Sequence, residues 1–354
     1  MDRRPEVDGA GRMPVPARRC SRRAWLQALA AAAIAAGRGP VRAASADRVR
    51  TWQLATGYPA HGFHARNIER FAQDVQAATG GALRIDVHAG GQLAPLPEIL
   101  DGLRAGRFEA GEVLLSGSAA QLPLADVDAV PFVVSGYEDA RRLAGISRAF
   151  IDQDARALGL RLLFDVPWPP QGLYARRPVG SIADLRGMRF RVYNETTRRF
   201  AAYVQAQPVE IGAVELPEAI RTGRIDAMLT SAATGVDSEA WNGLRHFYDI
   251  HAWIPKNAVL VRLAAFDALP PEHQGRVLDA AAVAQQRGWQ MSQDEAGAAR
   301  QALAARGMTV EPPGAILARE LKRLGEKFSL EWIRGTAGRG NAVFLPYFTQ
   351  AASR

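Results

Sequence analysis

Two widely separated stretches of the chain follow the same plan. Each begins with an alternating run typical of a strand, Leu83–Val87 in the first stretch and Met188–Val192 in the second. Each continues with a helical run that stops at a glycine, Gly106 or Gly223, and then with a second short strand. Glycine suits the left-handed backbone position just beyond a helix, and alternation places the apolar side chains on one strand face. The repetition predicts two α/β lobes of similar construction with a cleft between them, although it is short and has no strict period.

The length and charge of the chain agree with two lobes and argue against a polyanionic partner. With 354 residues the chain exceeds the usual size of a single domain. Its formal net charge of +8 is unevenly distributed, because residues 1–46 hold nine arginines against three acidic residues. The remaining 308 residues therefore carry only +2, and we expect no nucleic-acid partner.

The first 46 residues are expected to be a cleaved export signal. Basic residues precede Ala24–Ala36, an Ala-rich run that is too short to anchor in a bilayer. Ser21–Gln27 resembles a twin-arginine signal, and Ala44–Ala46 offers a cleavage site before Asp47. An ordinary secretory signal and a disordered basic tail are the alternatives. Because Cys20 is the only cysteine, a mature chain without it has no disulfide and suits an oxidising compartment.

The order of predicted elements divides the mature chain into two discontinuous lobes. Lobe I is expected to comprise residues 47–168 and about 256–295, and lobe II residues 169–255 and about 296–354. The boundary at 168–170 carries two prolines, which remove hydrogen-bond donors and prevent regular structure. Several crossings between lobes indicate a hinge rather than two independent domains.

A long helical pattern extends over residues 271–306 and is interrupted only by Gly288 and Gly297. Each helical residue adds about 1.5 Å of length. We therefore expect a helix long enough to run along both lobes as a brace.

Several motifs in order give the chain a family likeness. Asp184–Val192 is followed by Thr222–Ala227, and Gly91–Leu93, Val130–Phe132 and the long late helix lie elsewhere. The chain thereby resembles the DctP-type solute-binding proteins of tripartite ATP-independent periplasmic (TRAP) transporters. The resemblance covers essentially the whole mature chain. It implies an α/β, two-lobed periplasmic-binding-protein-like fold with a hinge, an interlobe cleft and a long bracing helix.

The resemblance also implies a function. A protein of this kind is a periplasmic receptor, expected to be a monomer, that binds a small organic acid in the cleft. It delivers this acid to the membrane subunits of a TRAP permease. The alternative class is an extracytoplasmic two-lobed α/β enzyme acting on a small organic acid, with Glu112 as a general acid or base. No G-x-S-x-G elbow, Walker sequence or Rossmann glycine triplet supports it.

In the family, the arginine that ends the Asp-Leu-Arg-Gly run usually clamps the ligand carboxylate, and the matching residue is Arg191. The position is chemically sensible, because ligands of open α/β sheets lie beyond the carboxyl ends of strands. A guanidinium also offers two parallel donors to a carboxylate. The alternative is a solvated arginine or a structural ion pair with Asp226 or Glu210. Arg189 is expected to be a surface charge.

The resemblance implies further ligand contacts on both sides of the cleft. Thr230 and Ser231 follow the next strand, where their hydroxyls could donate to ligand oxygens or simply cap a turn. Asn194 could add a polar contact. Glu112 holds the corresponding place in the first lobe, where it either faces the cleft, accepting a ligand hydroxyl or screened by Arg191, or has an outward structural role.

Trp168 and Gln171 lie where the chain crosses between the lobes. Trp168 could stack on an apolar or aromatic ligand body, or pack within the hinge. Some members of the family place an extra arginine near Gln171. Its absence here favours a monocarboxylate over a dicarboxylate.

No metal or other cofactor is expected. A metal-assisted branch of the family carries Asp-x-x-Glu-Trp where this chain has Asp226–Thr230, without the second carboxylate or the Trp. The histidines lack partnered carboxylates at a convincing ligand spacing, so we expect surface or packing roles for them. They are His61, His64, His246 and His251.

Overall fold

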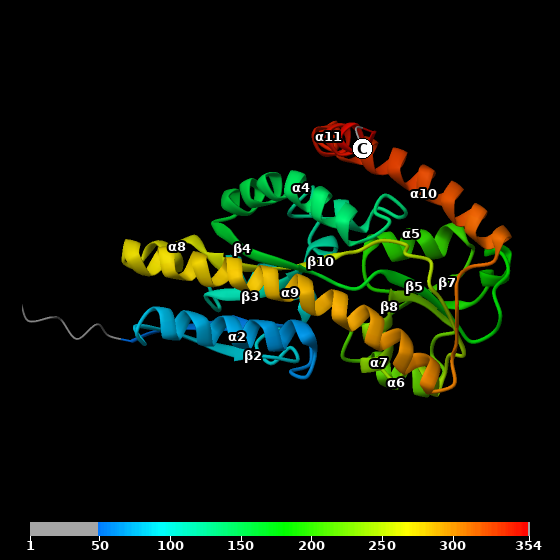
Figure 1. The fold of residues 1–354 in the computed structure, drawn as a ribbon, viewed down its shortest axis with the longest axis horizontal. Coiled ribbons are helices and arrows are strands. Elements are labelled where there is room, and N and C mark those ends of the chain that lie inside the picture. Colours follow the sequence, from blue (N-terminus) through cyan, green and yellow to red (C-terminus); the bar gives the residue numbers. More distant parts are fainter. Residues whose placement is uncertain (1–48, 353–354) are drawn as a thin grey trace, which may run out of the picture. The chain divides into compact units, whose positions relative to one another are not determined.

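The computed structural model of the chain describes residues 49–352, and the expected export signal at residues 1–46 lies outside them. The described chain forms two β-sheets covered by helices (Figure 1). The strands of the first sheet are β1 (Arg50–Ala55), β2 (Leu83–His88), β3 (Ala110–Leu114), β4 (Leu160–Pro167) and β10 (Lys256–Arg262). Those of the second are β5 (Gln171–Ala175), β6 (Arg189–Val192), β7 (Gln207–Glu210), β8 (Ala227–Ser231), β9 (His246–Tyr248) and β11 (Thr309–Glu311).

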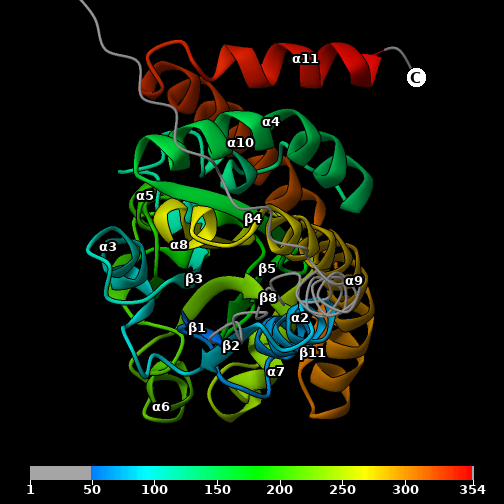
Figure 2. The same ribbon diagram turned by 90° about the vertical axis from the view of Figure 1, so that its left-hand side faces the viewer.

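The helices fill the segments between these strands and form the last part of the described chain. They are α2 (Phe63–Ala78), α3 (Ile99–Arg104), α4 (Tyr137–Ala157), α5 (Glu195–Tyr203), α6 (Leu216–Arg221), α7 (Ala232–Asp237), α8 (Leu263–Asp267), α9 (Pro271–Ala305), α10 (Ala315–Gly335) and α11 (Asn341–Ala352). Helix α4 lies along β4 with α11 packed upon it, and α2 packs beside α9 (Figures 1 and 2). Within residues 49–352, none of the helices combines the length and the apolar character needed to span a membrane.

The predicted α/β class with two lobes is confirmed, and both sheets are mixed. The strand order is β2-β1-β3-β10-β4 in the first sheet and β11-β9-β5-β8-β6-β7 in the second. In the first sheet β10 runs antiparallel to β3 and β4, and in the second β5 runs antiparallel to β8 and β9. Strand β10 comes after all the strands of the second sheet except β11, yet it lies between β3 and β4 in the first sheet.

The structure contains the repeat that the sequence predicts. In the first half of the repeat, however, the sequence pattern selects the strand after the one that truly corresponds. The parallel strands are β2-β1-β3 in one sheet and β7-β6-β8 in the other. Strand β6 therefore occupies the place of β1, whereas the sequence pattern pairs it with β2. The second halves do correspond, since β3 and β8 each follow a short helix and lie on the same side of the central strand.

In addition to the long helices α9 and α10, two segments without regular structure join the lobes, and they bond to each other. The first, at 168–170, has no regular structure, as its prolines predict. The second covers residues 249–255. The backbone N–H of Trp168 donates to the carbonyl of Pro255 at 2.8 Å, and that of Gln171 to the carbonyl of Trp253 at 2.9 Å. The crossing is thus a short two-stranded strap.

Helix α9 is the predicted brace. It is 35 residues long, begins with a proline in its first turn, and packs on α2 and β4 and further along on α7 and β11 (Figure 1). Gly288 makes the close approach to β4 possible, because a Cβ there would collide with Val166 and lie 2.7 Å from the amide nitrogen of Asn67. Gly297, in the same helix, has open space around it.

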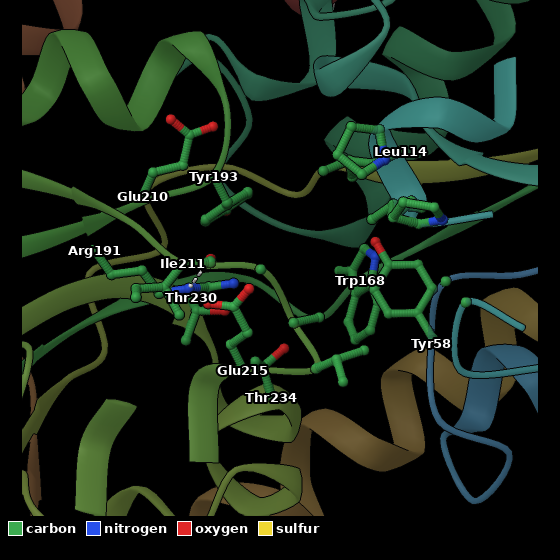
Figure 3. Close-up of a pocket in the computed structure, with 18 of the residues that line it drawn as sticks. Tyr58, Leu114, Trp168, Arg191, Tyr193, Glu210, Ile211, Glu215, Thr230 and Thr234 are labelled. Carbon is green, nitrogen blue, oxygen red and sulfur yellow. Dashed lines mark hydrogen bonds between the residues drawn. The ribbon is translucent and has the colours of Figure 1, made fainter. Parts of the chain in front are cut away.

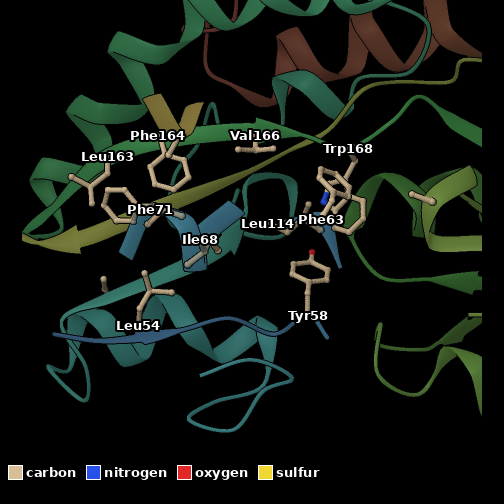
Figure 4. Close-up of a cluster of buried hydrophobic side chains, with 14 of the residues drawn as sticks. Leu54, Tyr58, Phe63, Ile68, Phe71, Leu114, Leu163, Phe164, Val166 and Trp168 are labelled. Atoms are coloured by element: carbon tan, nitrogen blue, oxygen red, sulfur yellow. The ribbon is translucent and has the colours of Figure 1, made fainter. Parts of the chain in front are cut away.

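The apolar face of α2 builds the core beneath the first sheet. Ile68, Phe71 and their neighbours are buried there, and the rings of Phe71 and Phe164 lie 5.0 Å apart in an edge-on contact. The cluster continues without a break to Tyr58 and Trp168 (Figure 4). The same cluster continues into the second lobe, so Tyr58 and Trp168 lie where the cores of the two lobes meet.

Candidate ligand-binding site

A cavity of about 530 Å³ lies beyond the carboxyl ends of the parallel strands of both sheets. Its lining includes residues that follow β1, β2, β6 and β7 directly, together with the last residue of β3 and part of β8. Ligands of open α/β sheets bind at this position, because the loops after the strands converge there. The lining residues are Gly57, Tyr58, Gly90, Gly91, Pro95, Leu96, Pro97, Leu114, Trp168, Gln171, Arg191, Tyr193, Glu210, Ile211, Gly212, Ala213, Val214, Glu215, Thr230, Thr234 and Pro255.

Two parts of this lining face each other across the cavity (Figure 3). One side, which we call the aromatic wall, is formed by Tyr58, Leu114 and Trp168. The other, which we call the arginine wall, is formed by Arg191 and Thr230. The aromatic wall lies where the cores of the two lobes meet, and the arginine wall belongs to β6 and β8 of the second lobe.

Arg191 is a buried cation with most of its donors unused. Its side chain is only 4% exposed, and its Nε donates to the carbonyl of Ile211 at 3.1 Å. Its guanidinium carbon lies 4.6 Å from the centre of the Tyr193 ring. Within residues 49–352, its two terminal nitrogens make no hydrogen bond and no carboxylate forms an ion pair with it. Burial lowers the pKa of the Arg191 guanidinium from its usual range, although arginine stays protonated in proteins.

The acidic residues considered as structural partners of Arg191 pair with other arginines. Asp226 accepts from Arg189 at 2.7 Å, and Glu210 accepts from Arg198 at 3.0 Å. Arg189 itself is 43% exposed. Two arginines on one face of the same strand thus differ completely, since Arg189 is exposed and paired whereas Arg191 is buried and has no acidic partner in the described chain.

Thr230 and Ser231 are adjacent but take different roles. Thr230 lines the cavity and is almost fully buried, and its hydroxyl makes no hydrogen bond to another described residue. Ser231 does not belong to the lining. It is the N-cap of α7, and its Oγ accepts from the backbone N–H of Thr234 at 3.1 Å. The free hydroxyl is therefore that of Thr230.

Asn194 also acts as a helix cap. Its Oδ1 accepts from the backbone N–H of Thr197 at 2.9 Å at the start of α5. Its Nδ2 donates to the hydroxyl of Ser116 at 2.9 Å, on the segment that follows β3. It lies outside the cavity lining, where it joins the two lobes.

Glu112 is fully buried in β3, behind the aromatic wall rather than in it. Its two carboxylate oxygens accept from the hydroxyl of Thr56 and from Nδ2 of Asn257, the latter at 2.7 Å. Nδ1 of His64 lies 3.2 Å from the same oxygen as Asn257. His64 is buried and packs with its ring 4.2 Å from that of Trp168, but it also has a carboxylate partner in Glu112, which the sequence did not predict.

Trp168 and Gln171 both line the cavity, and both bond within the protein. The indole Nε1 of Trp168 donates to Oδ1 of Asn257 at 3.0 Å. The amide of Gln171 donates from Nε2 to the carbonyl of Pro169 at 2.8 Å. Its Oε1 accepts from the hydroxyl of Tyr193 at 3.3 Å.

Tyr58 is the lining residue that sequence reasoning missed most clearly. It follows β1, the strand that occupies in the first sheet the place of β6 in the second. Matched in this register, the repeat places Tyr58 shortly after β1, as Tyr193 and Asn194 come shortly after β6. The Gly57–Pro59 turn was visible in the sequence but carried no functional assignment.

The arrangement suits the binding of a small anion. Arg191 is the only cation among the residues that line the cavity in the described chain, and much of the remaining lining is apolar. Glu210 and Glu215 are exposed where they line it. Within residues 49–352, no group of three or more His, Cys, Asp or Glu side chains could hold a metal ion.

A two-lobed fold with such a cavity between the lobes is the architecture of periplasmic solute-binding proteins. The chain belongs to the DctP family, described as bacterial extracellular solute-binding protein family 7, whose model matches residues 55–324. The members of this family are periplasmic receptors rather than enzymes. The resemblance to TRAP solute-binding proteins is therefore confirmed.

The chain is similar to solved receptors over most of its length. Two are DctP6 and DctP7 of Bordetella pertussis, extracytoplasmic solute receptors that bind pyroglutamic acid. The chain is 35% identical to DctP6 with a TM-score of 0.83, and 38% identical to DctP7 with a TM-score of 0.82. Each comparison covers 84% of this chain and 99% of the receptor.

A curated relative is more distant. It is a monocarboxylate 2-oxoacid-binding periplasmic protein of Nostoc, 25% identical over 241 residues, which are 63% of this chain. The chain spans 63% of the length of that relative, less than two thirds of it.

Proposed function

We propose that this protein is the solute receptor of a TRAP transporter and that it captures a small monocarboxylate for the membrane permease. The observation that carries the proposal is Arg191, a buried cation in the cavity lining whose terminal nitrogens have no partner among the described residues. An unpaired buried charge is costly. A ligand carboxylate would satisfy it with two parallel, charge-assisted hydrogen bonds.

The charges around the cavity favour one carboxylate over two. Arg191 could pair with the first. A second carboxylate on the same ligand would find Gln171 where an additional arginine would be needed, and it would approach Glu210 or Glu215. Like charges in a partly desolvated site repel each other.

Pyroglutamate is the first candidate within this class. Two receptors that are 35% and 38% identical to this chain bind pyroglutamic acid. Its flat ring would lie against Tyr58 and Trp168 while its carboxylate pairs with Arg191 and Thr230. The other candidates are short 2-oxo acids, favoured by the Nostoc relative, and aromatic monocarboxylates, which would stack on Trp168.

Lobe closure would complete the capture. We place the hinge in the strap formed by residues 168–170 and 249–255. The described parts of the lobes are then residues 49–168 with about 256–295, and 169–255 with about 296–335, whereas α11 packs on α4 of the first lobe. Closure would remove water from the carboxylate and from Arg191 together, which strengthens their interaction.

Mass spectrometry of the ligand that accompanies the protein from the periplasm tests the proposal directly. Calorimetry with the ligand-free protein then ranks pyroglutamate, a 2-oxo acid, an aromatic monocarboxylate and the dicarboxylate glutarate. We expect a monocarboxylate to bind most tightly. A dicarboxylate that binds about tenfold tighter than any monocarboxylate, a difference of about 1.4 kcal/mol, would overturn the assignment of ligand class.

A further inference from the structure

A buried chain of hydrogen bonds lies behind the aromatic wall. Glu112 accepts from Nδ2 of Asn257, and Oδ1 of Asn257 accepts from Trp168 at 3.0 Å and from the hydroxyl of Tyr58 at 3.4 Å. Asn257 and Glu112 are both buried and lie outside the cavity lining. Asn257 is thus the hub between one carboxylate and two ligand-facing rings.

The chemistry of these partners fixes the orientation of the Asn257 amide. A carboxylate only accepts hydrogen bonds, so Glu112 requires the NH₂ group of Asn257 on its side. An indole N–H only donates, so Trp168 requires the carbonyl oxygen on the other side. Rotating the amide by half a turn would place an oxygen against the Glu112 carboxylate and an NH₂ group against the Trp168 N–H. Both contacts would be repulsive.

This orientation leaves the aromatic wall without a free donor. The N–H of Trp168 and the O–H of Tyr58 both point to the same oxygen of Asn257. Burial, followed by the nearby Glu112, raises the pKa of the Tyr58 phenol, so the phenol keeps its single proton. Tyr193, next to this wall, likewise donates to Gln171, and burial raises its pKa to about 12.

We propose that Glu112 and Asn257 are positioning residues that set ligand selectivity by keeping the donors of Tyr58 and Trp168 away from the cavity. This inference rests on the proposed function. At the aromatic wall a ligand finds apolar ring faces and the lone pairs of Tyr58. An apolar group or an N–H donor is accepted there, whereas a second carboxylate is left unpaired and is rejected.

On this proposal, one cavity holds a cation and still rejects a second anionic group. The arginine wall supplies all the donors for one carboxylate, and Glu112 removes the donors from the opposite side. Selection against a ligand by unpaired polar groups is as effective as selection for it by good contacts.

The main experiment compares the ratio of the affinities for two ligands rather than the affinity for one. Wild-type protein and Asn257→Leu are titrated with pyroglutamate and with glutarate. The leucine frees the donors of Trp168 and Tyr58, so the preference for pyroglutamate should fall by about tenfold, the size of one or two hydrogen bonds. If Asn257→Leu weakens both ligands by the same factor, its role is only structural and the proposal is wrong.

A charge exchange supplies the rescue. Asn257→Asp alone sets two carboxylates against each other, whereas Glu112→Gln with Asn257→Asp restores one donor and one acceptor at that contact. The double variant should recover the wild-type ligand ratio, because the carboxylate introduced at position 257 again accepts from Trp168 and Tyr58. A double variant with the same lowered preference as Asn257→Leu would contradict the proposal.

NMR spectroscopy of the wild-type protein keeps the proposal testable if the Asn257 variants do not fold. Because Asn257 accepts from the indole N–H of Trp168, this proton, assigned with Trp168→Phe, should be protected from exchange with water both before and after pyroglutamate binds. An indole proton that exchanges freely in the ligand-free protein and becomes protected only when pyroglutamate binds would mean that Trp168 donates to the ligand, and it would overturn the proposal. If the wild-type protein binds no organic acid at all, the proposed function fails, and this inference fails with it.

Discussion

The two walls of the cavity use their hydrogen-bonding groups in opposite ways. On the arginine wall, the terminal nitrogens of Arg191 and the hydroxyl of Thr230 have no partner among the described residues. On the aromatic wall, the donors of Tyr58 and Trp168 are both taken up by Asn257. Burial alone therefore does not identify a binding group. What matters is whether a buried group still needs a partner.

Removing Arg191 should have the largest effect on ligand binding, because it removes the cation of the wall whose polar groups are unpaired. Loss of one partner of a desolvated ion pair costs about 3–5 kcal/mol. At about 1.4 kcal/mol per tenfold change, Arg191→Ala should weaken binding of the acid by about a hundredfold or more in calorimetry. Arg191→Lys should restore only part of it, since an ammonium cannot form two parallel hydrogen bonds to one carboxylate.

Arg189→Ala is the matched control on the same strand. Arg189 is 43% exposed and already paired with Asp226, so its removal should change the affinity by less than about threefold. If well-folded Arg191→Ala binds the acid as tightly as the wild-type protein, the contrast between the walls is wrong.

A substitution in α9, behind the aromatic wall, should have an effect of intermediate size, and this effect concerns stability. Gly288 of α9 touches Val166 of β4, two residues before Trp168, and has no room for a Cβ. Gly288→Ala should therefore lower the free energy of unfolding by about 1–3 kcal/mol, as overpacking does in other cores. Urea unfolding of the ligand-free protein measures it.

Gly297→Ala is the control within the same helix. Gly297 has open space around it, and alanine has the higher helix propensity, so stability should rise by up to about 1 kcal/mol. If both variants changed the free energy of unfolding by the same amount, α9 would not pack closely on β4 at Gly288 as described.

The sequence was sufficient for the order of elements and for the brace. Alternation marked the strands, glycines marked helix ends, and the long pattern at 271–306 became α9. Four of the seven residues expected at the ligand site, Trp168, Gln171, Arg191 and Thr230, line the cavity. Each of them lies beside a strand end or at the crossing, positions that the order of elements defines.

The other three residues expected at the site are Glu112, Asn194 and Ser231, and there are physical reasons why the sequence could not place them. Strand alternation distinguishes two faces of β3 but not which face meets the cavity, so the direction of Glu112 depended on tertiary structure. Asn194 and Ser231 stand at strand-to-helix turns, where a side chain can cap the helix or reach a ligand. Both cap helices here. Tyr58 was missed because two alternating strands, β1 and β2, look alike until their order in the sheet is known.

The smallest expected effect separates two neighbouring residues of the arginine side, Thr230 and Ser231. Thr230→Val replaces a hydroxyl by a methyl group of similar size. Because that hydroxyl has no partner among the described residues, the free energy of unfolding should not fall. Binding of the acid should weaken by the value of one hydrogen bond, about 1 kcal/mol or roughly fivefold.

Ser231→Ala should behave in the opposite way. It removes the N-cap of α7, where Oγ accepts from Thr234 at 3.1 Å, and loss of such a cap costs about 0.5–2 kcal/mol of stability. Its affinity for the acid should stay close to that of the wild-type protein, since Ser231 does not line the cavity. Thermal unfolding and calorimetry are measured on both variants. Ser231→Ala should lower only the stability, and Thr230→Val only the affinity. If Ser231→Ala lost affinity while Thr230→Val did not, the binding hydroxyl would be that of Ser231, and the arginine wall would have to be redrawn around it.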